Sequence, residues 1–483
     1  MTAQPGAQDV LDSPDATGRV ARGGVLRVAA FAGGILLGLV GVVALTRHLG
    51  PAGYGRYQAV TALVAIVAAL GDAGLGTLAL RSHAQAEPPE RDRVLDAVLG
   101  LRLLLALAGV AVAALAAVVL GYDGAMIAGG AIAAGAALPN AVAQTASVPL
   151  QTALRIGTVA ALDLARQAVT TALVLALVAA GAGLVAFLAV PVPAALALMV
   201  ATAAVARAVP RPALSRADSP RLLRDGAVVG LATASGVLYL YTSLIVCQLV
   251  ATPDETGWFS ASFRVIIIVA AVPALLGTSA FPLLARAAVT ERARLARVAS
   301  GLVEGSVLLG GAATLGAVLG APAIIAVVAG DGYDAAIAPL RIQGVALGLT
   351  FTISALGFTL LARHRHRALV LCNAIGFAAS AGVVAVLAAA HGERGAATGA
   401  AIAEVVLCAA YAIAVLQDVP LRPRRLPRIL LALAAGLAAG AVAPVPAVPA
   451  VAIGLLVYGA AAAALRAVPA EAARALRPTM GRR

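Results

Sequence analysis

Long apolar runs separated by short polar segments occupy almost the whole chain. A membrane helix needs about 20 mostly apolar residues, because each residue adds only about 1.5 Å towards crossing a hydrocarbon layer ~30 Å thick. About fourteen runs meet this requirement. They lie at roughly 25–46, 54–80, 94–120, 124–148, 157–180, 184–206, 225–250, 257–284, 298–328, 336–361, 368–390, 394–416, 428–443 and 448–465. The pattern therefore predicts an all-α polytopic membrane protein.

Two of these runs are irregular. The run at 428–443 is the shortest, and the run at 184–206 contains Pro191 and Pro193. Proline lacks the backbone N–H that a helix interior requires, so we expect a kink or a broken helix in that run.

The arginines give a separate line of evidence for the topology. Basic loops stay on the cytoplasmic side of a membrane. If the chain starts in the cytoplasm, every second loop is basic, and 30 of the 35 arginines take cytoplasmic positions. The other loops carry acidic residues or almost no charge; the acidic ones are Asp123, Asp254, Glu255, Asp331, Asp334 and Glu393. We therefore expect both termini to be cytoplasmic.

Composition excludes a soluble protein. Hydrophobic residues make up 61% of the chain and charged residues 12%, with a mean hydropathy of +0.98, whereas soluble domains carry roughly a quarter charged residues. The net charge of +13 follows from the basic loops and indicates no nucleic-acid partner. Cys247, Cys372 and Cys408 all fall within apolar runs. They support neither a disulfide framework nor a metal site.

The chain divides into two halves at a proline-rich basic segment. Gly55-Arg56-Tyr57 and Gly257-Trp258-Phe259 open two runs that lie six spans apart, which suggests a parallel internal repeat. We predict two six-helix lobes and two appended helices. The expected parts are a disordered cytoplasmic N-terminus at 1–22, an N-lobe at 23–206, a cytoplasmic linker at 207–224, a C-lobe at 225–417, helices 13 and 14 at 418–466 and a cytoplasmic tail at 467–483.

Five stretches occur in the order typical of one transporter family. They are Thr46 to Tyr57, Gly71 to Leu75 with Arg81, Gly257 to Phe263 followed by Pro273 and Phe281 to Ala285, Ile324 to Ile342 around Gly330-Asp331-Gly332-Tyr333, and Gly392 to Ala397. Together they resemble the polysaccharide biosynthesis (Wzx-type) flippases of the multidrug/oligosaccharidyl-lipid/polysaccharide exporter superfamily. The resemblance covers about residues 20–420. One departure is Ser243, close to the point where the family often carries an aspartate.

Ionisable side chains within predicted spans are the candidates for function, because each costs at least ~2.5 kcal/mol at mid-helix. Arg264, Arg166 and Arg81 are candidates for binding a diphosphate, since a guanidinium binds phosphate bidentately. The alternatives are a snorkelling or ion-paired Arg264 and a local ion pair between Arg166 and Asp163.

Three carboxylates are candidates for ion coupling: Asp72, Glu304 and Glu404. The alternatives are pairing of Asp72 with Arg81 and structural hydrogen bonding by the two glutamates. Four amides are candidates for lining a cavity that accommodates sugar, although such amides also bridge helices. They are Asn140, Gln144, Gln248 and Asn373.

The resemblance implies that the chain flips an undecaprenyl-diphosphate-linked oligosaccharide across a bacterial cytoplasmic membrane by alternating access, without a cofactor or a resident metal. Its partners would be the lipid-linked oligosaccharide, membrane lipids and polysaccharide-assembly enzymes. A cation-coupled drug antiporter of the same superfamily is the main alternative, and a scaffold for glycosyltransferases is another. A membrane polymerase or ligase fits less well, because the predicted outer loops are all shorter than about 15 residues. No nucleotide-binding or hydrolase motif is present either.

Overall fold

The computed structural model describes residues 16–207, 210–214, 219–290 and 292–468. The first residues of the predicted disordered N-terminus (1–15) and most of the predicted tail (469–483) lie outside the described residues. So do two short pieces of the predicted linker, at 208–209 and 215–218.

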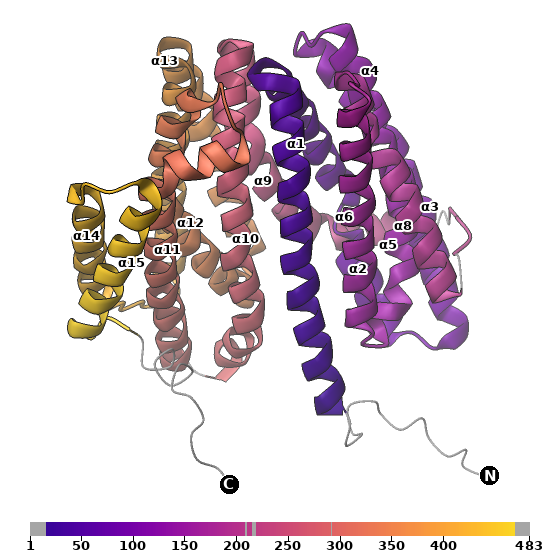
Figure 1. Ribbon diagram of the computed structural model, residues 1–483. Helices are drawn as coiled ribbons and strands as arrows, with labels where there is room; N and C mark the ends of the chain where they lie inside the picture. The colour runs from indigo at the N-terminus through magenta and orange to yellow at the C-terminus, as the bar shows by residue number, and fades with distance from the viewer. Residues whose placement is uncertain (1–15, 208–209, 215–218, 291, 469–483) are drawn as a thin grey trace. The chain divides into compact units, whose positions relative to one another are not determined.

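The described residues form α-helices and one short 3₁₀ helix, so the predicted all-α class is confirmed (Figure 1). The helices are α1 (Ala16–Asp72), α2 (Leu75–Gln85), α3 (Pro88–Val119), α4 (Gly124–Gly135), α5 (Ala137–Thr152), α6 (Ile156–Ala179), α7 (Leu184–Ala189), α8 (Pro191–Ala206), α9 (Ser219–Val250), α10 (Pro253–Thr290), α11 (Arg292–Val328), η1 (Asp334–Ala336), α12 (Ile337–Ala362), α13 (His366–Leu416), α14 (Leu426–Val442) and α15 (Ala447–Ala464).

Eleven segments of the described residues are long and apolar enough to cross a membrane, and α14 is a shorter apolar helix. The longest two, Ala29–Gln85 and His366–Leu416, have 57 and 51 residues. Each is more than twice the roughly 20 residues of one crossing. The backbone leaves helical geometry within both, at Gly50 and at His391–Gly392. Large apolar side chains also face outwards, for example Leu115 and Val386, which are 65% and 69% exposed. Such a surface is typical of a protein that faces lipid.

Three of the predicted runs are interrupted, two of them next to a proline. The predicted break in the run at 184–206 is confirmed, because α7 ends at Ala189 and Pro191 is the first residue of α8. A second break was not predicted: α4 ends at Gly135 and α5 begins at Ala137. Pro139 lies in the first turn of α5, where its missing N–H costs least. The run at 54–80 is also divided, by a turn at Ala73–Gly74 between α1 and α2.

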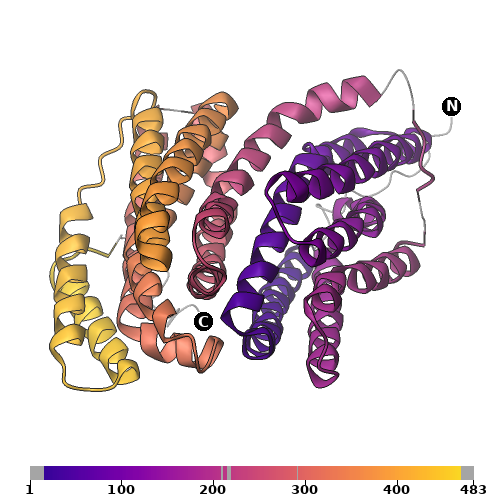
Figure 2. The same ribbon diagram turned by 90° about the horizontal axis from the view of Figure 1, so that it is seen from above.

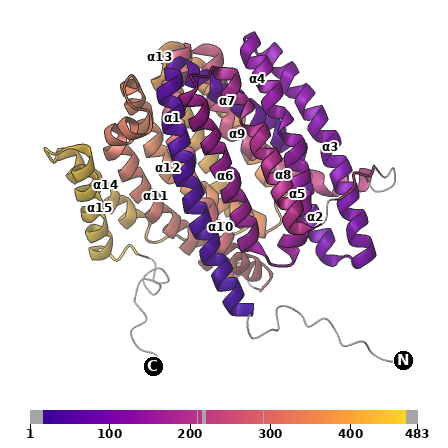
Figure 3. The same cartoon turned by 45° about the vertical axis from the view of Figure 1, so that its right-hand side comes forward.

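The contacts divide the chain into two units. The first unit contains Met1–Ala44 and Val67–Gly230, and the second contains Leu45–Ile66 and Leu231–Arg483. The middle of α1 therefore belongs to the second unit. In the first unit, α3 packs on α4 and α5, and α5 and α6 pack on α8 (Figure 3). The hydroxyl group of Thr171 in α6 donates to the carbonyl oxygen of Leu37 in α1 at 2.9 Å.

The second unit is built around α11 and α12. α12 packs against α10, α11 and α13, and the hairpin formed by α14 and α15 packs on α11 (Figures 1 and 2). Close packing of small residues holds the hairpin together: a Cβ on Gly436 would lie 2.7 Å from the carbonyl oxygen of Gly454. Tyr458 in α15 donates from its hydroxyl to the carbonyl oxygen of Leu308 in α11 at 2.7 Å.

Candidate functional site

Two of the sequence motifs, Thr46–Tyr57 and Gly257–Phe263, meet within the second unit. We call this contact the α1–α10 junction. The two backbones touch there: a Cβ on Gly257 would lie 2.0 Å from the carbonyl oxygen of Pro51, and a Cβ on Gly55 would lie 2.8 Å from the nitrogen of Gly257. Real Cβ atoms do not approach backbone so closely, so both positions require glycine. The two similar sequence stretches that begin at Gly55 and Gly257 are thus in contact with each other.

The turn before α12 completes this junction. The hydroxyl group of Thr46 donates to the carbonyl oxygen of Val328 at 3.0 Å, and the hydroxyl group of Tyr333 donates to the carbonyl oxygen of Thr46 at 3.2 Å. Burial raises the pKa of Tyr333 above its ordinary value, so this hydroxyl keeps its proton and remains a donor. The indole of Trp258 donates to the carbonyl oxygen of Gly332 at 2.9 Å. Three motifs far apart in sequence therefore build one end of the second unit.

Arg264 lies two helical turns after Gly257 in α10, among tyrosines. Its charge acts on the hydroxyl groups of Tyr54, Tyr57 and Tyr241. The rings of Tyr54 and Tyr57 are stacked with their centroids 6.3 Å apart. The side chain is half-buried, and its buried Nε atom has no hydrogen-bond partner among the described residues. The buried hydroxyl group of Tyr54 has none there either. This part of the unit therefore offers a cation and a hydroxyl group whose hydrogen-bonding capacity is unused.

Glu404 in α13 is held by hydroxyl groups instead of a basic side chain. Thr350 in α12 donates to its Oε1 at 2.6 Å, and Tyr239 in α9 donates to its Oε2. Next to it, Asn373 in α13 donates to the hydroxyl of Ser235 at 3.0 Å and accepts from Tyr411 at 2.9 Å. This polar network joins three helices of the second unit, and Asn373 bridges helices within it.

Glu304 in α11 is buried and binds the start of α14. Its Oε1 accepts the backbone N–H of Arg425 at 2.9 Å, and its Oε2 accepts a guanidinium N–H of the same residue at 3.0 Å. One turn away, the hydroxyl of Ser300 accepts the backbone N–H of Arg422 at 2.9 Å. Arg425 precedes the first residue of α14, so Glu304 satisfies a backbone donor at the N-terminus of that helix.

Asp72 in the first unit pairs with Arg102, whereas Arg81 was the partner that the sequence suggested. The Nη2 atom of Arg102 in α3 lies 2.9 Å from Oδ1 of Asp72, and its Nη1 atom donates to the hydroxyl of Thr145 in α5 at 3.2 Å. The guanidinium side chain is 5% exposed and the carboxylate 45%. Arg102 is not among the candidates that the sequence analysis names. Its place inside the apolar run at 94–120 was the available signal.

The remaining candidates are spread over several helices. In the first unit, Arg81 is exposed on α2 and Arg166 is half-buried on α6, where its charge acts on Asp163. On α5, Asn140 is half-buried and Gln144 is exposed. In the second unit, Gln248 in α9 is half-buried, and its Oε1 has no hydrogen-bond partner among the described residues. Arg264 is thus the only one of the three candidate arginines in the second unit.

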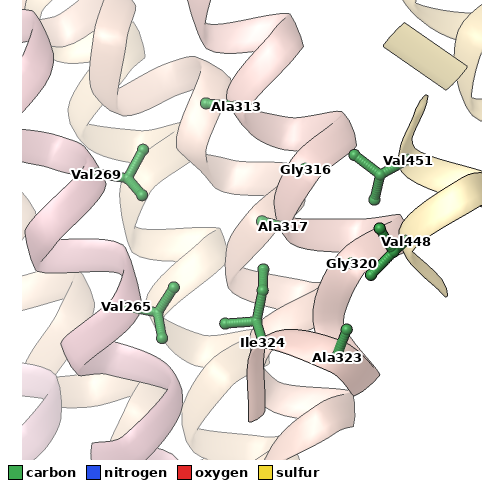
Figure 4. A pocket seen from close by; sticks show the side chains of 10 residues that line it. All are labelled: Val265, Val269, Ala313, Gly316, Ala317, Gly320, Ala323, Ile324, Val448 and Val451. Carbon is green, nitrogen blue, oxygen red and sulfur yellow. The ribbon is translucent and has the colours of Figure 1, made fainter. Parts of the chain in front are cut away.

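An apolar cavity of about 370 Å³ lies between α10, α11 and α15 of the second unit (Figure 4). Figure 4 shows side chains of Val265 and Val269 on one side and of Val448 and Val451 on the other, with the α11 backbone at Gly316 and Gly320 between them. Val265 directly follows Arg264 in α10. The cavity can accommodate hydrocarbon but offers nothing to a charged group.

The sequence family described as "Polysaccharide biosynthesis protein" matches residues 21–288, more than half of the chain. The chain belongs to this family. The expectation drawn from the five motifs is confirmed to that extent. No curated protein sequence matches.

Solved structures of transporters share the fold. The structure described as "Lipid II flippase MurJ, inward closed conformation" has a TM-score of 0.73 at 11% identity, covering 91% of this chain and 98% of that one. An inward-facing multidrug resistance MATE family transporter of the MOP superfamily has a TM-score of 0.65 at 14% identity, covering 82% of this chain and 98% of that one. A MOP superfamily transporter from Pyrococcus furiosus has 0.58 at 16% identity, covering 86% and 99%. The chain thus belongs to a polysaccharide biosynthesis family and shares its fold with solved membrane transporters.

Proposed function

We propose that this family member flips an undecaprenyl-diphosphate-linked oligosaccharide across the bacterial cytoplasmic membrane by alternating access, for the synthesis of a cell-surface polysaccharide. The family description supports a role in polysaccharide biosynthesis. Similarity in fold to a lipid II flippase supports a lipid-linked substrate. The proposal rests on one observation, which is that the buried Nε atom of Arg264 has no hydrogen-bond partner among the described residues.

Arg264 is suited to bind the diphosphate. Phosphate oxygens accept two parallel hydrogen bonds from a guanidinium group, and the strength of such bonds increases away from water. The Nε atom of Arg264 has no partner among the described residues, and no carboxylate described here lies within ion-pair distance of it. The Tyr54 hydroxyl is a further unused donor. A transporter for cationic drugs would place a carboxylate at such a position.

The other candidate residues are assigned separately in each unit. In the first unit, Arg166 and Arg81 are the arginines that we propose as diphosphate contacts. Asn140, Gln144 and Gln248 are the amides that we assign to the sugars, whereas the amide of Asn373 is already bound to Ser235 and Tyr411. The apolar cavity beside Val265 takes part of the prenyl chain, because its apolar lining replaces the contacts that the chain makes with lipid.

Ion coupling is assigned to Glu404 in preference to the other two carboxylates. Asp72 and Glu304 each form an ion pair with an arginine, at 2.9 Å and 3.0 Å. Protonation of either would leave a buried or half-buried arginine without its counter-charge, which is costly. Glu404 has only hydroxyl donors, so it can change charge without breaking an ion pair.

The proposed topology has fourteen crossings and both termini in the cytoplasm. Counting the two longest segments as two crossings each and adding α14 raises the eleven candidates to fourteen. The basic segments then lie on the cytoplasmic side, where they contact anionic lipids and offer binding sites to polysaccharide-assembly enzymes. We assign the alternation to the predicted lobes at 23–206 and 225–417, except that residues 45–66 belong with the second.

The test is the exposure of a labelled undecaprenyl-diphosphate-linked oligosaccharide in proteoliposomes that contain the wild type, Arg264→Ala or Arg341→Ala. Arg341 is exposed on α12 and serves as the matched control. We expect protein-dependent exposure with the wild type and the control, and at least a tenfold slower rate with Arg264→Ala, because a charge-assisted hydrogen bond is worth about 1.5–3 kcal/mol.

The outcomes separate the alternatives. Equal rates for all three proteins would retain the flippase and remove Arg264 from its site. No protein-dependent exposure of the lipid would contradict the proposed function and favour the drug antiporter. Transport of a cationic dye by the same vesicles would then test the antiporter directly.

A further inference from the structure

Helix α9 has two functionally different faces. Ser235 and Tyr239 are four residues apart and lie on the same face, where they contact Asn373 and Glu404 of α13. Tyr241 lies two residues further on, about 200° around the helix, and therefore faces the opposite side. There its ring meets that of Phe263 edge-on at 6.2 Å, and the charge of Arg264 acts on its hydroxyl. One helix thus lies between the Glu404 network and the Arg264 site.

The surroundings of Glu404 hold hydroxyl and thiol groups that can respond when it binds a proton. The titratable groups that interact with it are Tyr239 from α9 and Cys408 and Tyr411 from α13 itself. Helix α12 contributes the hydroxyl of Thr350. In the described part of the chain, no basic side chain forms an ion pair with Glu404. Protonation therefore removes the only formal charge from this network.

We propose that protonation of Glu404 sets the affinity of the Arg264 site for diphosphate through α9, with Tyr239 as the positioning residue. As a carboxylate, Glu404 accepts the Tyr239 hydroxyl and ties α9 to α13. When a proton from water binds, the neutral carboxyl group is a poorer acceptor and has an O–H of its own, so the hold on α9 weakens. Tyr241 on the other face then moves relative to Arg264. This inference rests on the proposed function of Arg264.

The sign of the effect follows from the hold on α9. Once that hold weakens, Tyr241 leaves the Arg264 site open to an anionic ligand, so the protonated protein binds diphosphate more tightly. Binding is reciprocal, so the ligand in turn favours proton uptake by Glu404. Coupling between two sites is commonly 5- to 150-fold in affinity.

Calorimetric titration of the purified full chain with an undecaprenyl-diphosphate-linked monosaccharide between about pH 5.5 and 8.5 tests this inference. Both phosphates of this ligand stay ionised over that range, so its own charge is constant. Titrations in two buffers of different ionisation enthalpy give the number of protons taken up on binding. We expect wild-type affinity to fall at least about fivefold from low to high pH, with proton uptake on binding.

Three variants follow the route of the coupling. Glu404→Gln should bind at the low-pH affinity throughout, without proton uptake. Tyr239→Phe should lose most of the pH dependence, because it removes the link to α9. Thr350→Val also removes a donor to Glu404 but lies on α12, and it should keep the difference between low and high pH. Tyr458→Phe, which removes a buried hydroxyl on α15, is the control and should behave as the wild type does.

Different failures have different meanings. A Glu404→Gln variant that keeps the wild-type pH dependence, or a Thr350→Val variant that loses it as Tyr239→Phe does, overturns the inference and leaves the proposed function intact. Wild-type protein that binds the ligand at no pH, or an Arg264→Ala variant that binds as tightly as the wild type, contradicts the assignment of Arg264 on which the inference depends.

Discussion

The carboxylate of Glu304 binds Arg425 twice, through the backbone N–H at 2.9 Å and through the guanidinium at 3.0 Å. One buried side chain of α11 thereby fixes both the first turn of α14 and the charge beside it. The hairpin that forms one wall of the apolar cavity begins at this point. This contact explains Glu304 without any role in ion coupling.

Glu304→Ala should destabilise the protein, because it leaves a helix N-terminus and an arginine without their acceptor. We expect a loss of about 3 kcal/mol, as when one partner of a buried pair is removed. Unfolding in a denaturing detergent, followed by circular dichroism, gives the free energy. Arg424→Ala, at an exposed neighbouring position, is the control and should change it by less than about 0.5 kcal/mol. Equal effects of the two variants would contradict this account.

The pair of Asp72 and Arg102 predicts an asymmetry between its two single variants. Asp72→Ala leaves a guanidinium that is 5% exposed without its counter-charge and should cost about 3 kcal/mol. Arg102→Met leaves a carboxylate that is already 45% exposed and should cost about 1 kcal/mol. The double variant should be more stable than Asp72→Ala alone. Thermal unfolding of all four proteins measures the cycle, and a double variant less stable than both single ones would contradict it.

Gly257→Ala tests the α1–α10 junction. The added methyl group would lie 2.0 Å from the carbonyl oxygen of Pro51, so the two backbones must separate. We expect a loss of at least about 1–3 kcal/mol and reduced transport. Gly305→Ala is the matched control, since a Cβ there meets nothing within 4 Å and alanine favours the helix. Wild-type stability of Gly257→Ala would show that the junction tolerates a wider separation.

The link between Asp418 and Arg363 predicts a pH dependence of stability. Nε of Arg363 lies 2.8 Å from Oδ2 of Asp418, and this hydrogen bond holds the pKa of Asp418 below its ordinary value. The folded protein thus binds this proton less readily than the unfolded chain. The stabilisation is therefore complete above about pH 5 and is lost as the pH falls below about 4, through the lowered pKa.

Melting temperatures of the wild type and Asp418→Asn between pH 3 and 7 check this prediction. The difference between the two proteins should be largest near neutral pH and should shrink towards zero at the acid end. A difference that stays constant over the whole range would mean that the charge of Asp418 contributes nothing and that only its shape is needed.

The sequence predicted the fold class well because membrane helices are recognised by the length and apolarity of their sequence. It also predicted the break before Pro191. It missed the break before Ala137, although Pro139 lies two residues beyond it, because the whole run is apolar and resembles a single crossing. Apolar residues indicate that a segment lies in lipid, but they say little about where its backbone bends.

The site residues were harder to predict, since their partners lie far away in the chain. Glu304 and Arg425 are 121 residues apart, and Tyr239 and Glu404 are 165 apart. Nothing in the local sequence distinguishes a carboxylate that forms an ion pair with an arginine from one that accepts hydrogen bonds from hydroxyl groups. The motif glycines at positions 55 and 257 were visible as a repeat, but their contact with each other was not.

The contact between Trp258 and Gly332 gives the protein a built-in optical signal. The chain contains one tryptophan, and its indole donates to a carbonyl oxygen at the α1–α10 junction. The tryptophan emission of the unlabelled protein therefore comes from a single known place. A shift of its wavelength during a transport cycle would report, without any attached dye, when the turn before α12 leaves α10.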